Sequence, residues 1–288
     1  MTSAVAPTPP EQRKTFQDEP IPKVARDTLN WFSIALAMSN VLMQLSNIKV
    51  GYGVAESKVE SGRLDKHPLK RGRTTLTFLA IASNGTAAER EYLRKEVNRA
   101  HRQVHSAPGA PVKYNAFSPD LQLWVAACLY KGAVDLAEAL DLPLSRQDRE
   151  DFYHHSARFA TTLQVPQEMW PADREAFEKY WRSEVEKLEL DDYAREFLHD
   201  LASMAFLPTP LRQTVGPVIF FLSAGFLPQE FRDLLGMKWN RPRQFLLDRV
   251  IRTAAAVNRV MPAVVREFPF NFYLWDFRRR MRKGLPVV

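Results

Sequence analysis

The sequence predicts an all-α protein, folded as a single compact domain of about ten helices. Apolar residues recur at helical spacing along most of the chain, and short connections marked by proline or glycine separate these segments. The chain shows no alternation of strand and helix patterns and no repeat period. Because only 11 glycines are present and valine, isoleucine and threonine are scattered, a β-sandwich or barrel is disfavoured.

The first expected helix spans 26–45 and is apolar on two sides, so we expect it to be buried on both. Its stripes are Leu29, Phe32, Leu36 and Met43, and Ile34, Met38, Val41 and Leu45. The stretch 29–48 has the length of a membrane span but carries seven Asn, Ser and Gln residues, and 214–227 is too short. We therefore expect neither stretch to cross a membrane.

Capping residues mark the starts of the helices that follow. Thr86, with Glu89 three residues later, forms a capping box, and that helix is expected to run to about His105. Ser118 followed by Pro119 begins the next helix. The expected helices after the first cover 71–81, 86–105, 118–134, 145–163, 171–188, 191–205, 211–226, 228–235 and 243–260.

Length and composition limit the class of protein. A chain of 288 residues that is 45% apolar can build a core without disulfide or zinc crosslinks. The single cysteine, Cys128, excludes an intramolecular disulfide framework and a four-thiolate metal site, and it fits a cytoplasmic location. The proline-rich N-terminus lacks the apolar segment of a signal peptide. We expect 1–22 to be a disordered tail and 23–288 to be the helical domain.

The net charge of +7 favours acidic partners, such as phosphate groups or an anionic membrane surface. The basic residues form a run only at 278–283, directly after the aromatic stretch 268–277. A nucleic-acid surface would interleave aromatic and basic residues on one face, so we expect no nucleic-acid partner. A solvated basic end or peripheral contact with a membrane surface fits better.

Common catalytic motifs are absent from the sequence. It contains no GxGxxG after a strand, no GxxxxGK[ST], no HExxH and no GxSxG. Nucleotide binding and the commonest serine-hydrolase and zinc-protease designs are therefore disfavoured, which leaves the six histidines as the main candidates for chemistry.

His101 and His105 lie four residues apart and share one face of a predicted helix. His101 falls on the apolar stripe with Leu93 and Val97, and His105 lies nearer its edge. A neutral imidazole at either position could bind a metal ion. Alternatively, His101 is a hydrogen-bonded core residue and His105 a surface residue.

Two further sets of residues carry polar chemistry. Asp151 with His154, and Glu196 with His199, repeat the i, i+3 spacing found in di-iron helical bundles, although exposed polar faces would look the same. The segment from Arg71 to Thr75 follows Lys66, His67 and Lys70. It could hold a carboxylate or a bound oxygen species, or it could be a basic turn that opens a helix.

The order of several short motifs is more informative than any one of them. They are Leu42-Met-Gln-Leu, Val50-Gly-x-Gly-Val54, Arg71-x-x-Thr74-Thr75, Gly85-Thr86, Val97-x-x-x-His101-x-x-Val104, Tyr114-x-Ala116-x-x-Pro119-Asp120-x-x-x-Trp124-Val125, Pro143-Leu-Ser145, Pro208, Leu227-Pro228-x-x-x-Arg232, Leu235-Gly236 and Pro262. This ordered set, over roughly residues 25–270, resembles the MpaB-type oxygenase family, which includes rubber oxygenase (latex-clearing protein).

The resemblance implies helices packed around a b-type haem whose iron is bound by His101. Arg71, Thr74 and Thr75 match the segment that lines the distal side of the haem in the family, with Thr74 where the rubber enzyme has lysine. Arg71 would neutralise a haem propionate or steady bound oxygen, and Thr75 would donate a hydrogen bond. Glu56 is the nearest candidate for the catalytic glutamate base of the rubber enzyme, with Glu60 behind it.

On this resemblance we expect a haem b-dependent oxygenase that acts with O₂ on a hydrophobic, isoprenoid-like substrate. Two alternatives stay open. One is a non-haem iron metalloenzyme that uses Asp151, His154, Glu196 and His199. The other is a non-catalytic helical protein that binds lipid or a membrane surface.

Overall fold

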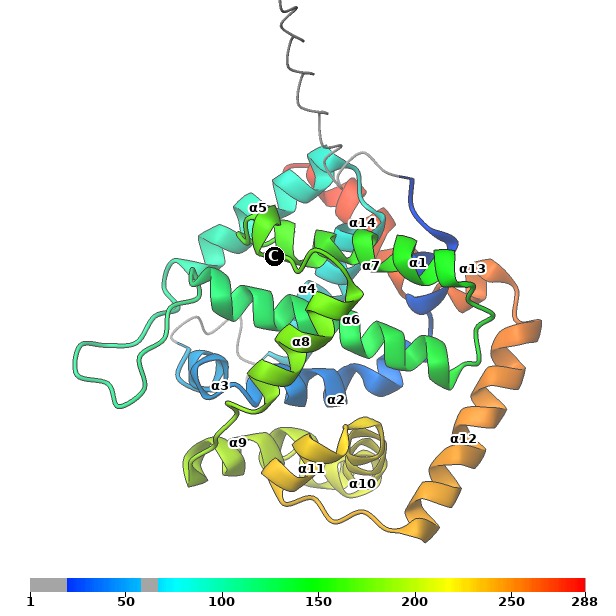
Figure 1. The fold of residues 1–288 in the computed structure, drawn as a ribbon. Helices are drawn as coiled ribbons and strands as arrows, with labels where there is room; N and C mark the ends of the chain where they lie inside the picture. Colours follow the sequence, from blue (N-terminus) through cyan, green and yellow to red (C-terminus); the bar gives the residue numbers. More distant parts are fainter. Residues whose placement is uncertain (1–19, 58–66, 288) are drawn as a thin grey trace, which may run out of the picture.

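The computed structural model describes residues 20–57 and 67–287, and it confirms the all-α, single-domain prediction (Figure 1). Within those ranges there are fourteen α-helices, one short 3-10 helix and no strand. Residues 1–19 of the expected tail, together with Glu60 and Lys66, lie outside the described residues. The helices are α1 (Lys23–Thr28), α2 (Ser33–Leu45), α3 (Ile48–Ala55), α4 (Pro68–Asn84), α5 (Ala87–His101), α6 (Pro119–Ala139), α7 (Arg146–Thr161), η2 (Gln167–Met169), α8 (Arg174–Val185), α9 (Asp192–Ala202), α10 (Thr209–Phe226), α11 (Gln229–Leu235), α12 (Arg241–Val260), α13 (Ala263–Arg266) and α14 (Phe270–Arg282).

The predicted capping signals start helices where expected. Thr86 and Glu89 form both hydrogen bonds of a capping box at α5, and Ser145 does the same with Asp148 at α7. Ser118 precedes α6, although its side chain makes no capping hydrogen bond. These starts are fixed by local sequence, which is why the pattern predicts them.

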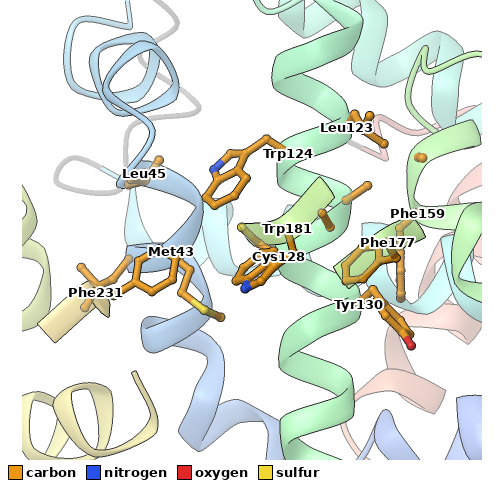
Figure 2. Close-up of a cluster of buried hydrophobic side chains, with 14 of the residues drawn as sticks. Met43, Leu45, Leu123, Trp124, Cys128, Tyr130, Phe159, Phe177, Trp181 and Phe231 are labelled. Carbon is orange, nitrogen blue, oxygen red and sulfur yellow. The ribbon is translucent and has the colours of Figure 1, made fainter. Parts of the chain in front are cut away.

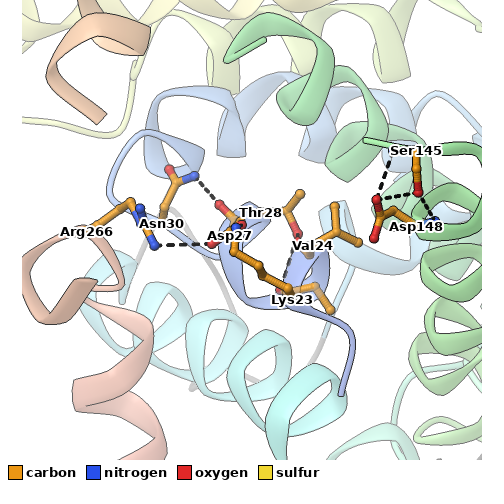
Figure 3. A network of polar contacts seen from close by, with 9 residues as sticks. Lys23, Val24, Asp27, Thr28, Asn30, Ser145, Asp148 and Arg266 are labelled. Atoms are coloured by element: carbon orange, nitrogen blue, oxygen red, sulfur yellow. Dashed lines mark hydrogen bonds and ion pairs between the residues drawn. The ribbon is translucent and has the colours of Figure 1, made fainter. Parts of the chain in front are cut away.

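The predicted single helix over 26–45 is wrong, because the chain breaks between α1 and α2. The buried Asn30 causes the break: its side-chain oxygen accepts from the backbone N–H of Phe32 at 2.8 Å, and its amide donates to the carbonyl of Asp27 at 2.6 Å. Asp27 is held in turn by Lys23 and by Arg266 from the far end of the chain (Figure 3).

The C-terminal segment forms a packed helix instead of a solvated end. Phe270 and Phe277 of α14 are buried, and the helix packs against α4. Arg278 donates to Glu89 of α5 at 2.7 Å. Part of the basic run is therefore used inside the fold.

Helix α6 runs through the middle of the molecule and carries the centre of the core (Figures 1 and 2). Trp124 stacks on Trp181 with ring centroids 5.2 Å apart, and it also lies against Phe231 of α11. Aromatic stacking adds to the free energy gained by burying the ring area. The Trp124 indole N–H donates to the carbonyl of Gln44 at 2.9 Å, which fixes α2 against α6.

No helix in the described part of the chain combines the length and apolar character that crossing a bilayer requires.

Candidate functional site

A half-open cavity of about 250 Å³ lies among α2, α3, α4, α5 and α6. Its walls are mostly apolar, with a few convergent polar groups, which is the usual make-up of a small-molecule site. The apolar lining comes from Leu45, Val50, Val54, Phe78, Leu79, Val97, Val104, Leu121, Val125, Leu129 and Leu163. The charged and polar side chains that face it include His101, Arg71, Thr74, Thr75 and Lys49.

His101 is the last residue of α5 and lines this cavity. Steps of four residues place it on the face that buries Leu93 and Val97, as the sequence predicts. Burial, together with the positive charge of Arg71, lowers the pKa of His101 to about 4. The ring is therefore neutral at physiological pH, the state in which imidazole binds a metal.

The Nδ1 atom of His101 is buried and has no hydrogen-bond partner among residues 20–57 and 67–287. Most buried polar atoms are paired, so this nitrogen calls for an explanation. Nδ1 of His155 is in the same state, so the evidence that points to ligand binding at His101 is its position at the wall of the cavity.

His105 lies outside the cavity, because α5 ends at His101 and not at the predicted residue 105. The chain turns there, and His105 pairs as an isolated bridge with Asn115. Its exposed side chain places Nδ1 3.2 Å from the carbonyl oxygen of Ser106. The structure thus separates two histidines that the sequence places on one helical face.

Helix α4 presents Arg71, Thr74, Thr75 and Phe78 to the cavity, at the i, i+3, i+4, i+7 spacing of one helical face. Burial lowers the pKa of Arg71. No carboxylate of the described residues lies within ion-pair distance of its guanidinium. Arg71 is thus a cation without an acidic protein partner in this part of the structure. The hydroxyl of Thr74 donates to the carbonyl of Lys70 at 2.9 Å.

Glu56 does not line the cavity. It is exposed at the end of α3, but the hydroxyl of Tyr114, which does line the cavity, donates to its carboxylate at 3.1 Å. Burial and the charge of Glu56 raise the pKa of Tyr114 to about 12. Gly53 lies beside the ring, since a Cβ there would be 3.4 Å from it, an ordinary van der Waals contact.

Lys49 and Tyr114 are lining residues that the sequence analysis missed. Lys49 is exposed at the mouth of the cavity. Tyr114 begins one of the quoted motifs, but nothing in the sequence shows that its side chain reaches the cavity. Nothing in the sequence around Lys49 marks it.

The structure does not assemble the second set of histidines and carboxylates into a site. The described residues contain no group of three or more His, Cys, Asp or Glu side chains that could hold a metal ion. His199 donates from Nε2 to the carbonyl of Leu235 at 2.6 Å, and Asp151 accepts from Gln147 at 2.7 Å. These two residues make ordinary structural contacts.

Comparisons with known proteins agree with the motif order. Residues 25–256 match the family described as "ER-bound oxygenase mpaB/B'/Rubber oxygenase, catalytic domain". Two uncharacterized proteins, from Mycobacterium tuberculosis and Mycobacterium bovis, are each 46% identical to this chain over 253 residues. That alignment covers 88% of this chain and 99% of each relative. No solved structure matches the chain.

Proposed function

Because the chain belongs to the MpaB/rubber oxygenase catalytic-domain family, we propose that it is a haem b-dependent oxygenase with His101 as the iron ligand. The observation that carries the proposal is the position of His101, a neutral imidazole at the wall of an apolar cavity. A porphyrin needs one axial ligand from the protein, whereas a bare iron site needs several.

Other residues that line the cavity also fit a haem. Arg71 and Lys49 would pair with the two propionate carboxylates, since neither has a carboxylate partner among residues 20–57 and 67–287. The apolar wall would exclude water from the ring. At about 250 Å³ the cavity is smaller than most ligand sites, so a planar macrocycle would push aside side chains at its mouth.

Bound haem would supply the oxygen chemistry, and the protein would position the reactants. Thr75 would donate a hydrogen bond into the cavity from α4. The Thr74 hydroxyl donates to the Lys70 carbonyl, and threonine at this position lacks the amine that lysine would offer to a bound group. Glu56, oriented by Tyr114, would accept a proton at the edge of the cavity.

The substrate that fits this lining is hydrophobic, and we propose an isoprenoid-like chain that reacts with O₂. Branched apolar side chains on three sides of the cavity offer contact area without hydrogen bonds. A carbon–carbon double bond in such a chain is the group that an oxygenase of this kind would attack.

The test is a titration of the purified protein with haemin, followed by O₂ uptake with squalene. Squalane, the saturated chain of the same length, is the matched control. The proposal expects one haem per chain and O₂ uptake with squalene alone. If the protein binds haem saturably but takes up no O₂ with any unsaturated chain, the proposed isoprenoid-like substrate class is wrong. A protein that contains iron and takes up no porphyrin would favour the non-haem alternative.

A further inference from the structure

Large apolar side chains are exposed mainly in one segment of the chain. Ten of the sixteen most exposed large hydrophobic residues in the described ranges lie between 245 and 275. We call these ten residues the α12–α14 strip. They are Phe245, Leu246, Val250, Val257, Val260, Val264, Val265, Phe268, Phe272 and Trp275. Soluble monomers seldom leave so much contiguous apolar surface in water unless it binds something.

On α12 the strip occupies one helical face. Leu246, Val250, Val257 and Val260 follow heptad-like spacing, and Val260 is 82% exposed. The helix buries its other face through Leu247, Ala254, Ala255 and Asn258. Helix α12 lies along one edge of the molecule, so its outer face has no neighbour there (Figure 1).

The exposed residues continue along the chain through α13 into α14. The Asn271 amide donates to the carbonyl of Val264 at 2.7 Å, which joins α13 to α14. The rings of Phe268 and Phe272 lie 6.4 Å apart, and those of Phe272 and Trp275 lie 5.8 Å apart. The exposed aromatic residues therefore form one cluster at the end of the strip.

The positive charge of the protein is concentrated in the same segment. Residues 241–283 contain 11 Lys and Arg against three Asp and Glu, a net +8, whereas the whole chain carries +7. Some of these arginines are used internally, for example Arg278 with Glu89. Arg249 and Arg252 have no described carboxylate within ion-pair distance. The Arg249 guanidinium lies 5.6 Å from the centre of the Phe245 ring.

From this combination we infer that the α12–α14 strip docks on an anionic lipid bilayer. Exposed valine, leucine and aromatic side chains would enter the boundary between headgroups and acyl chains, while Arg249 and Arg252 reach the lipid phosphates. Trp275, with Arg279 stacked over its ring at 5.8 Å, is the residue pair typical of a membrane–water interface. A second copy of the chain fits less well, because two-fold pairing of this face would bring arginines against arginines.

Vesicle flotation of the full-length protein tests this inference and does not require haem. We expect binding to phosphatidylcholine vesicles that contain phosphatidylglycerol, little binding to phosphatidylcholine alone, and release at high salt. The variant Arg249→Gln/Arg252→Gln should weaken partitioning about fivefold for each arginine removed. Arg146→Gln, an exposed arginine on α7, is the matched charge control and should bind as wild type does.

Separate variants test the apolar residues of the strip. Val260→Ser/Val264→Ser should weaken binding at unchanged charge, while Val218→Ser on α10, also exposed, should not. Unaltered thermal unfolding shows that the variants fold. Absence of binding to anionic vesicles overturns the inference, and so does binding that the strip variants leave intact. If the protein does not bind vesicles but forms dimers that the strip variants disrupt, the partner of the strip is a second copy of the chain. If it binds polyglutamate and not vesicles, the partner is an acidic protein.

Discussion

His101 and Arg71 face the same cavity from successive helices, and the charge of Arg71 adds to burial in lowering the pKa of His101 to about 4. The two side chains would bind different parts of a haem. A neutral imidazole can donate its lone pair to iron, and a guanidinium with no carboxylate partner among residues 20–57 and 67–287 can bind an anionic group of the ligand. Neither residue alone would distinguish this cavity from an ordinary packing defect.

Glu56 and Tyr114 should affect turnover without affecting haem binding. Glu56→Gln removes the proposed proton acceptor and should lower O₂ uptake about 100-fold or more, while the haem absorption stays unchanged. Tyr114→Phe removes only the hydrogen bond that orients Glu56 and should cost less. Tyr52→Phe is the control, because its hydroxyl donates to Asp191 away from the cavity. Equal uptake in all four proteins would show that Glu56 has no part in the reaction.

Buried His155 should make the protein acid-sensitive. Burial lowers its pKa to about 3, whereas the unfolded chain takes up the proton near 6.5. Between these values the unfolded state binds more protons, so stability falls as the pH drops below about 6.5, by up to ~1.4 kcal/mol per pH unit for one such group. Urea unfolding at a series of pH values measures the slope. His155→Gln should reduce the slope to the part that His101, with its pKa lowered to about 4, still contributes. The exposed His105→Gln should leave the slope as steep as in wild type.

The ion pair between Glu89 and Arg278 should stabilise the contact between α5 and α14. Burial raises the pKa of Glu89, but hydrogen bonds from Arg278 and Thr86 outweigh it and leave the pKa below its ordinary value. The contribution is therefore present near neutral pH and is lost as the pH falls through that lowered pKa. Arg278→Gln should cost about 1–3 kcal/mol of unfolding free energy at neutral pH. Arg282→Gln is the control: the Arg282 side chain donates to the backbone carbonyl of Arg278 and makes no ion pair with a described carboxylate, so the change should be less than about 0.5 kcal/mol.

Two glycine-to-alanine substitutions should change the free energy of unfolding in opposite directions. A Cβ at Gly132 would lie 2.2 Å from the amide nitrogen of Asn40, which donates to the carbonyl of Cys128 at 2.6 Å. Gly132→Ala should displace the Asn40 side chain, break this hydrogen bond and cost about 1–3 kcal/mol. Nothing lies within 4 Å of a Cβ at Gly72 in α4, so Gly72→Ala should stabilise by about 0.5–1 kcal/mol. Chemical denaturation measures both, and stabilisation by Gly132→Ala would contradict the packing described here.

Local signals in the sequence predict local features of the fold. The capping box at Thr86 and the apolar stripe that ends at His101 depend on residues three or four apart, and both are confirmed. The break at Asn30 depends on side-chain bonds to neighbouring backbone, which no periodicity shows. Helix α14 was missed because its stabilising partner Glu89 lies 189 residues away in the chain.

The residues of the cavity also divide into those that sequence motifs predict and those that depend on how the helices pack. Arg71, Thr74, Thr75 and His101 were found because motif order placed them together, and the structure brings all four to one cavity. Lys49 was missed because its position depends on how α3 packs. Glu56 was expected at the site and instead lies outside the lining, in contact with it through Tyr114.

The most direct test of the central claim is the absorption spectrum of haem-reconstituted protein with either histidine replaced. The account predicts a Soret band in the wild type and in His105→Ala, and its loss in His101→Ala with folding intact by circular dichroism. A band of equal intensity in His101→Ala, or none in reconstituted wild type, would contradict the assignment of His101 as the haem ligand.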